Sequence, residues 1–167
     1  LVTGATGFVG RRVIAALAAE GRFVRALVHS TSHAQALPDF EGNIAEGDIL
    51  SPDTLKRACE GVEAVIHLAA VIRERRGASY QQINNQGTQN ILGAAGAAGV
   101  RKFVHASTVG ATSDPGIPYL YSRWMAEQEV ERSGIHHTIV RFSVGFGEGD
   151  EFFNTIAALV KVAPLVP

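Results

Sequence analysis

The chain has few of the features that mark several common classes of protein. Its 167 residues include a single cysteine, Cys59, so no disulfide can form within it and a reducing, cytoplasmic compartment is expected. The formal net charge of -1 offers no basic surface for nucleic acid or anionic lipid. No apolar run approaches the roughly 18 residues that a membrane span requires, and no signal peptide is visible. We therefore expect no nucleic-acid partner and no membrane span.

The composition and the length of the chain predict one globular domain. Hydrophobic residues make up 46% of the chain and charged residues 19%, which is ordinary for a folded domain with a core. The sequence opens without methionine, inside what reads as a strand at residues 1–3, and it stops after an apolar helix. We expect residues 1–167 to form one domain that is part of a longer polypeptide.

Short apolar runs alternate along the chain with longer stretches of helical periodicity. The apolar runs predict strands at residues 1–3, 22–28, 43–46, 64–68, 102–106 and 137–142, and the run 64–68 predicts a strand buried on both faces. Helices are predicted at residues 9–19, 52–60, 80–98, 119–133 and 152–162, with Ser51 as the N-cap before Pro52. This alternation predicts an α/β fold with a doubly wound parallel sheet, the Rossmann fold, in three layers.

A glycine-rich segment lies where the first strand meets the first helix. Gly4, Gly7 and Gly10 follow a G-x-x-G-x-x-G spacing there. Such a turn lets the backbone approach a pyrophosphate, which the helix N-terminus attracts through its free N–H groups. Gly4 permits the turn, Gly7 keeps a side chain out of the phosphate path, and Gly10 lets the helix pack closely. The segment therefore predicts a dinucleotide site at Gly4, Thr6, Gly7, Phe8, Val9 and Gly10.

The end of the second strand bears on the choice of dinucleotide. An acidic residue at this place takes the ribose hydroxyls of NAD, but here the strand ends in His29 and Ser30. Without a carboxylate to repel it, a 2′-phosphate can take donors from His29, Ser30, Arg11 or Arg12. The sequence thus favours NADP(H) over NAD(H). Asp48, after the third strand, either accepts from the adenine amino group or caps the turn before Ser51.

With these residues in place, the chain resembles the extended and atypical short-chain dehydrogenase/reductases. The closest likeness is to the branch that contains the NADPH-binding accessory subunit of respiratory complex I and its bacterial relatives. The motifs that carry the resemblance cover nearly the whole chain: TGATGFVG at residues 3–10, GD at 47–48, HLAA at 67–70, NNQGTQN at 84–90, FVHAST at 103–108, SRWMAE at 122–127 and FGEGD at 146–150.

The resemblance implies a cofactor that lies across the carboxyl ends of the strands. Asp48 and Ile49 would contact it after the third strand. Leu68, Ala69 and Ala70 would line the adenosine side, and Ser143 and Val144 would approach the nicotinamide. In members of this family a further segment, which would follow Pro167, completes the substrate pocket.

The resemblance also implies a set of catalytic residues. Catalytic members use Asn, Ser or Thr, Tyr and Lys, which correspond here to Asn84, to Ser107 or Thr108, to Tyr119 and to Arg123. Arginine in place of lysine keeps the charge but changes the hydrogen-bond geometry. Two functions are therefore open: an oxidoreductase or epimerase/dehydratase that acts on a small molecule, or a non-catalytic module that holds NADP(H) for stability, sensing or assembly of a complex. The helices at 80–98 and 119–133 are surfaces on which related proteins form dimers.

Several other polar residues are interpreted as structural. Adjacent strand residues point to opposite faces, so His136 and His137 predict no metal site. Strand-end positions predict that His67 and His105 are hydrogen-bonded residues near the core. The remaining charged groups are expected on solvated surfaces: the arginines Arg73, Arg75 and Arg76 on a loop and the acids Glu127, Glu129 and Glu131 on a helix face.

Overall fold

Six parallel strands form one sheet in the order β3-β2-β1-β4-β5-β6. The computed structural model describes residues 1–30, 35–37, 40–147, 149–150 and 152–162. The sheet grows outwards in both directions from β1, which is the arrangement of a doubly wound fold. Its strands are β1 (Val2–Thr3), β2 (Arg25–Val28), β3 (Asn43–Glu46), β4 (Ala64–His67), β5 (Lys102–Thr108) and β6 (His137–Phe142).

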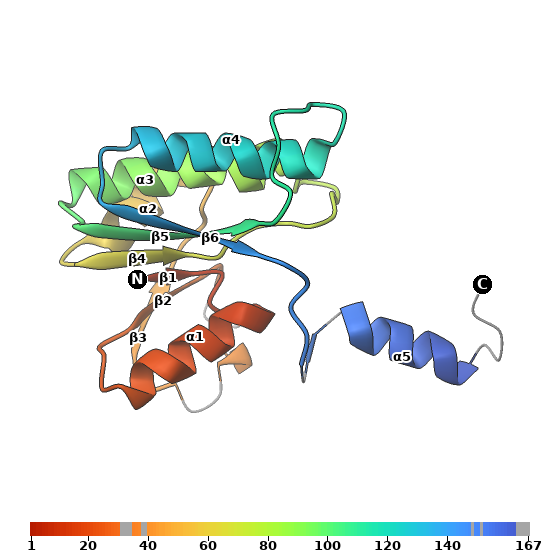
Figure 1. Cartoon of the computed structure of the whole chain (residues 1–167). Helices are drawn as coiled ribbons and strands as arrows, with labels where there is room; N and C mark the ends of the chain where they lie inside the picture. Colours follow the sequence, from red (N-terminus) through yellow and green to blue (C-terminus); the bar gives the residue numbers. More distant parts are fainter. Residues whose placement is uncertain (31–34, 38–39, 148, 151, 163–167) are drawn as a thin grey trace.

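The helices lie on opposite faces of this sheet (Figure 1). α1 (Phe8–Ala19) covers one face, whereas the other is covered by α2 (Pro52–Cys59), α3 (Gly87–Ala97) and α4 (Pro118–Arg132). A π-helical segment, η2 (Gln81–Gln86), leads directly into α3, and α5 (Phe152–Val162) follows β6. Right-handed crossovers place helices on one face when the chain moves one way along a parallel sheet and on the other face when it moves back. The expected three layers are confirmed.

The core consists of two apolar clusters, one on each face. The larger lies beneath α2, α3 and α4 and includes Leu55, Ile91, Phe103 and Val130. Phe103 is fully buried, and burial of a side chain of this size stabilises a fold by about 2–3 kcal/mol. The smaller cluster lies beneath α1 and includes Val2, Ile14, Ala26, Val28 and Leu37. Cys59 belongs to the larger cluster, and burial raises the pKa of its thiol to about 11, so it is a packing residue.

The structure departs from the predicted elements in four places. β2 begins at Arg25 rather than at residue 22, and β5 runs on to Thr108, so Ser107 and Thr108 lie within the strand. The single helix predicted at 80–98 is divided into η2 and α3, and Gly87 N–H donates to the carbonyl of Gln82, five residues before it. β4 is fully buried only on its α2–α4 face, because α1 leaves Ile66 half-buried on the other.

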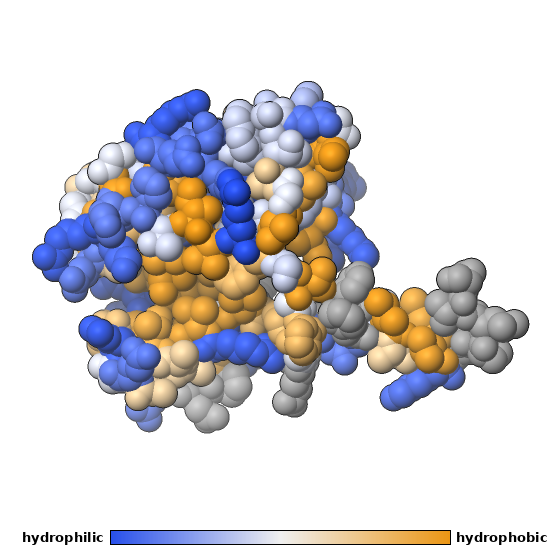
Figure 2. Space-filling model, in the orientation of Figure 1, coloured by the Kyte–Doolittle hydropathy of each residue, from blue (hydrophilic) through white to orange (hydrophobic). Residues whose placement is uncertain are grey.

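The edge of the sheet at β6 carries an apolar surface. Val140, Phe142, Val144 and Phe146 are exposed along β6 and the segment after it. Figure 2 shows an apolar band in the sheet layer between the helices above and below, and a second apolar surface on α5. Ile156, Leu159 and Val160 form that second surface, and α5 lies apart from the sheet (Figure 1). Among the described residues, no helix combines the length and the hydropathy needed to cross a bilayer.

Candidate functional site

The glycine-rich segment forms a tight turn that opens α1. Gly4 has φ 66°, and the N–H of Gly7 donates to the carbonyl of Gly4 at 3.1 Å. Gly7 is the N-cap, so α1 begins at Phe8 with its first N–H groups directed back towards the turn. The first turn of α1 contains no acidic residue that would compete for these groups. The turn therefore offers backbone donors and the positive end of a helix dipole to an anion.

Two glycines are required by close backbone contacts. A Cβ atom on Gly10 would lie 2.1 Å from the carbonyl oxygen of Gly4 and 2.7 Å from that of Ala5. A Cβ atom on Gly4 would lie 2.7 Å from the nitrogen of Ala69 and 2.8 Å from the carbonyl carbon of Leu68. The turn and the end of β4 therefore lie against each other, and Ala70, next along the chain, is exposed. This close approach brings two backbone segments together beside the N-terminus of α1.

The segment after β6 returns to the start of α1. A Cβ atom on Gly145 would lie 3.5 Å from the ring of Phe8, and one on Gly147 would lie 3.6 Å from the guanidinium of Arg12. Arg12 also stacks over the Phe8 ring at 4.0 Å and donates to the carbonyl of Phe8 at 2.9 Å. Ser143 and Val144, which precede this contact, are exposed. The structure thus brings the two residues predicted near the nicotinamide to the same side as the phosphate turn.

His29 and Asp48 meet at the ends of β2 and β3. His29 Nδ1 lies 3.7 Å from Asp48 Oδ2, and both side chains are partly exposed. The other carboxylate oxygen of Asp48 accepts the N–H of Leu50 at 2.8 Å, which is the turn-capping role that the sequence left open. A carboxylate therefore lies close to the end of β2, although it comes from the neighbouring strand. Ser30 is half-buried beside His29.

Ile49 and Asn84 are buried, and their contacts are with other parts of the protein. Ile49 is buried in the larger core cluster, and a Cβ on Gly87 would lie 2.7 Å from its Cδ1. Asn84 is fully buried, and its Oδ1 accepts the N–H of Val71 at 2.8 Å. Its Nδ2 donates to the carbonyl of Val71 and to Ser122 Oγ, at 3.1 and 3.0 Å. Asn84 thereby joins the segment after β4 to α4.

The two hydroxyl residues of β5 point to opposite faces of the sheet. Ser107 is buried on the α4 face, as strand alternation from Phe103 and His105 requires. Its Oγ forms no hydrogen bond of normal geometry among the described residues, but it lies close enough to Glu127 to favour the charged carboxylate. Thr108 is half-buried at the carboxyl end of the strand, and its Oγ1 donates to the carbonyl of Phe142 at 3.3 Å. Thr108 is thus the more accessible of the two hydroxyls.

Tyr119 and Arg123 lie one turn apart on α4 but in different surroundings. The Tyr119 ring is half-buried and packs against Tyr80 with a centroid distance of 5.6 Å. Arg123 is buried, and its Nη2 donates to the backbone carbonyl of Ala106. Burial lowers the pKa of Arg123, whereas the nearby Tyr119 and Glu127 side chains favour its charged form. The guanidinium therefore ties α4 to β5.

Glu127 is not on a solvated helix face, and that expectation was wrong. Its side chain is buried and accepts two hydrogen bonds from Arg141, at 2.9 and 2.6 Å. Burial alone raises the pKa of this carboxyl, but the Arg141 bonds, the nearby Ser107 hydroxyl and the charges of Arg141 and Arg123 together hold it below its usual value. The missed signal was available, because Glu127 stands four residues after Arg123 and so shares its helix face.

His67 and His105 stack beneath α4 with ring centroids 5.6 Å apart. His67 is hydrogen-bonded to Thr3 Oγ1 at 2.7 Å and to Thr88 Oγ1 at 3.1 Å, which agrees with the expected structural role. His105 is equally buried, but neither ring nitrogen has a partner within the described part of the chain. We refer to His67, His105, Ser107, Arg123 and Glu127 as the buried polar layer. Sequence reasoning did not predict their association.

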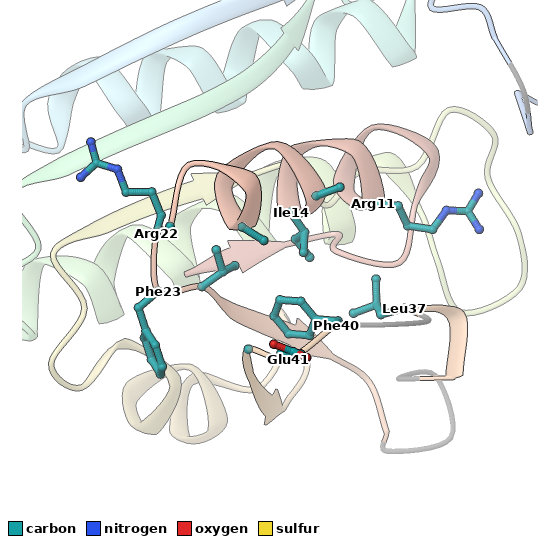
Figure 3. A pocket seen from close by; sticks show the side chains of 12 residues that line it. Arg11, Ile14, Arg22, Phe23, Leu37, Phe40 and Glu41 are labelled. Carbon is teal, nitrogen blue, oxygen red and sulfur yellow. The ribbon is translucent and has the colours of Figure 1, made fainter.

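A groove of about 700 Å³ lies elsewhere, between α1, residues 21–24, Leu37 and residues 40–42 (Figure 3). Ile14, Phe23, Leu37 and Phe40 give it an apolar lining, with Arg11, Arg22 and Glu41 at its rim. Arg11, a predicted donor to a 2′-phosphate, lines it, whereas the glycines of the turn and the predicted catalytic residues do not. The groove is therefore separate from the glycine turn and from Tyr119.

A glycine turn against a helix N-terminus, at the carboxyl edge of a doubly wound sheet, defines a dinucleotide-binding domain. Tyr119, a cation one helical turn later and a buried asparagine complete the pattern that the resemblance implied. The chain belongs to the NAD(P)H-binding family, whose model matches residues 4–150, and to the short-chain dehydrogenase/reductase superfamily. Its membership confirms the resemblance and the binding of a nicotinamide dinucleotide.

Known proteins similar to this chain include reductases. The ceramide reductase of Caulobacter vibrioides is 32% identical over 166 residues, which cover 99% of this chain and 52% of that protein. A second relative, a short-chain dehydrogenase/reductase superfamily protein from Agrobacterium tumefaciens, was solved with bound NAD. It is 31% identical with a TM-score of 0.75, and the match covers 92% of this chain and 53% of that protein. The NADPH-dependent quinone oxidoreductase of Escherichia coli, solved with NADPH, is 26% identical with a TM-score of 0.75. The match covers 96% of this chain and 54% of that protein. The chain therefore spans about half the length of these proteins.

Proposed function

We propose that the protein is an NADP(H)-dependent oxidoreductase in which Tyr119 exchanges a proton with the oxygen of a small-molecule substrate. The observation that carries the proposal is the half-buried Tyr119 in the first turn of α4, at the carboxyl edge of the sheet, which is also the edge of the glycine turn and of the segment after β6. Similarity to reductases and to a quinone oxidoreductase supports the same class of reaction.

The chain's own residues divide the work between binding and proton transfer. The backbone N–H groups of the glycine turn and the start of α1 would hold the pyrophosphate, with Leu68, Ala69 and Ala70 on one side and Ser143 and Val144 on the other. The bound nicotinamide would give or accept the hydride. Tyr119 would donate a proton to the substrate oxygen, or take one from it, and Thr108 would hold that oxygen by a hydrogen bond. Asn84 would keep the segment after β4 and the start of α4 in register.

The preference for NADP(H) rests on the charges around the end of β2. No acidic residue lies at that end in the sequence, and Arg11 and Arg12 stand in the first turns of α1. A 2′-phosphate placed near His29 and Ser30 would meet these donors, with Asp48 as the opposing charge.

The first test is a thermal melt of the full-length protein with NADPH, NADP⁺, NADH and NAD⁺ at equal concentrations. A ligand at 100 times its dissociation constant stabilises a protein by about 2.7 kcal/mol, which raises Tm by several degrees for a domain of this size. We expect a larger shift with the two phosphorylated cofactors. Equal shifts with all four would refute the proposed preference.

The second test concerns proton transfer. Tyr119→Phe removes the phenol and keeps the ring against Tyr80, so cofactor binding should persist while hydride transfer to carbonyl acceptors falls by at least about 100-fold. Tyr121→Phe, two residues along the same helix, is the matched control and should leave turnover near the wild-type rate. Equal loss in both variants would exclude a special role for Tyr119.

Arg123 favours a second candidate, a module that holds NADP(H) without turnover. In reductases of this family the cation beside the tyrosine acidifies the phenol, but here the guanidinium is buried and bonded to the Ala106 carbonyl. Tight cofactor binding with no hydride transfer to any of a panel of aldehydes, ketones and quinones would decide for the module. Recovery of turnover in Arg123→Lys would show that this one substitution had removed the activity.

A further inference from the structure

A short basic hairpin lies beside Tyr80, which packs on Tyr119. It comprises residues 72–79, between the end of β4 and η2, and we call it the basic hairpin. Arg75 and Ala78 exchange two backbone hydrogen bonds, at 3.2 and 2.9 Å, across a turn at Arg76 and Gly77, where Gly77 has φ 81°. The segment is an exposed loop, as the sequence predicts, and residues 75–78 form an ordered turn within it.

Both ends of the basic hairpin are anchored to the catalytic edge of the sheet. At its start, the backbone N–H of Val71 donates to Asn84, and the carbonyl of Val71 accepts from the same side chain. At its end, the Tyr80 hydroxyl donates to the carbonyl of Ile72 at 3.1 Å, and the Tyr80 ring packs on Tyr119. The hairpin thus stands next to the phenol that we assign to proton transfer.

The charges of the basic hairpin are not balanced locally. It contains three arginines, Arg73, Arg75 and Arg76, and one acid, Glu74, so its net charge is +2 in a chain of net charge -1. Glu74 Oε1 accepts the N–H of Tyr80 at 2.8 Å and so serves the start of the helix. Within the described residues, none of the three arginines forms an ion pair, and all three are exposed. Like charges so close together repel each other, and a bound anion removes that repulsion.

We propose that the basic hairpin recognises a carboxylate or phosphate group on the substrate. Guanidinium groups bind both anions through paired N–H donors, which gives them orientation as well as affinity. Ile72, 63% exposed, and the Tyr80 ring provide an apolar surface beside the arginines. The ligand that fits is a small molecule with an apolar or aromatic body and an anionic group, whose reacting oxygen reaches Tyr119. This proposal rests on the proposed function only for the identity of Tyr119 as the reacting group.

Three small probes separate the anion from the apolar body: benzoate, phenyl phosphate and benzyl alcohol. Each is titrated into ¹⁵N-labelled full-length protein, with and without NADPH, while the backbone amide signals of residues 72–79 and the arginine side-chain signals are followed. We expect the better of the two anions to bind at least about tenfold more tightly than benzyl alcohol. Whichever anion binds more tightly distinguishes a phosphate from a carboxylate group.

The decisive variant is Arg75→Gln/Arg76→Gln. It should weaken the binding of the two anions at least about fivefold and leave the binding of benzyl alcohol unchanged. The matched control is Arg22→Gln/Arg57→Gln, which removes the same charge from two exposed arginines that precede β2 and β4, at the opposite edge of the sheet. Equal affinity for all three probes, or equal loss in the two double variants, would overturn the proposal. A protein that binds the anions at the hairpin but gives no shift with NADPH would refute the proposed function and leave this inference intact.

Discussion

The glycine turn and the buried polar layer lie at the same edge of the sheet and are built in opposite ways. The turn consists of backbone, and its shape depends on the absence of side chains at Gly4 and Gly10. The buried polar layer consists of side chains from β4, β5 and α4 that approach one another only after the sheet and helices have packed. The first is local in sequence, and the second depends on contacts between distant segments.

This difference predicts how each region responds to substitution. A backbone cradle tolerates changes around it but no added atom within it, because carbonyl oxygens cannot move aside without loss of the turn. A buried side-chain layer responds in graded fashion, since each group contributes through charge, hydrogen bonds and burial. The following experiments test that contrast.

The largest effect is expected for Gly10→Ala. The new Cβ would lie 2.1 Å from the Gly4 carbonyl oxygen, so the turn must open or α1 must shift. We expect loss of measurable NADPH binding and a free energy of unfolding lower by about 3 kcal/mol or more, as for other overpacked sites. Calorimetric titration and urea unfolding measure the two quantities.

Gly96→Ala is the control for the same chemical change within a helix. Nothing lies within 4 Å of a Cβ added to Gly96 in α3, so the variant should be up to about 1 kcal/mol more stable through helix propensity. If Gly10→Ala bound NADPH as the control does, the turn would not be the cofactor cradle.

Acid should destabilise the protein through the buried polar layer. Burial, with the charge of Arg123, lowers the pKa of His105 to about 3, and burial also holds the pKa of His67 well below its usual value. The unfolded chain therefore takes up these protons first, and stability that is present above about pH 6.5 is lost as the pH falls. Each histidine contributes about 1.4 kcal/mol for each pH unit between its two pKa values. Urea unfolding between pH 7 and pH 5 measures the slope.

His105→Phe separates the two histidines, because phenylalanine retains a ring beside His67 but takes no proton. The pH dependence should fall to about half of the wild-type slope. A wild-type slope in His105→Phe would mean that the stacked pair is not the acid-sensitive element.

Asn84→Ala should have an intermediate effect. It removes three hydrogen bonds and leaves the N–H and the carbonyl of Val71 without their partner, which costs about 2–3 kcal/mol. Gln81→Ala, at an exposed position of the same helical segment, should change stability by less than about 0.5 kcal/mol. Similar unfolding midpoints for the two variants would show that Asn84 does not join the segment after β4 to α4.

The smallest effect is expected at the end of β2. Ser30→Asp places a carboxylate where we expect the 2′-phosphate, so NADPH should bind about tenfold more weakly, equivalent to about 1.4 kcal/mol, with little change for NADH. Ser113→Asp, at an exposed loop position, controls for the added charge. An equal loss of affinity for NADPH and NADH would mean that the adenosine ribose does not bind at the end of β2.

The fold was predictable because its signals are local. The alternation of apolar runs and helical periods located the strands and helices, and the spacing of Gly4, Gly7 and Gly10 located the cofactor turn. The buried polar layer was not predicted, since His67, His105 and Glu127 each look like ordinary surface or strand-end residues until α4 is placed over β5. The basic hairpin was missed for the same reason: its anchoring partners, Asn84 and Tyr80, follow it on another element.

The wide π-helical turn at Gln81–Gln86 makes chain length itself a determinant of the site. A π-turn holds one residue more than an α-turn, so Tyr80, directly before η2, is rotated by about 100° around the helix axis from the position that a regular α-helix would give it relative to α3. Deletion of Gln82 would restore regular winding and turn Tyr80 away from Tyr119, while Asn84, Tyr119 and the basic hairpin would all remain in the chain. Relatives that align without a gap across this turn are therefore expected to share the geometry of the basic hairpin, and those with a one-residue gap to have lost it.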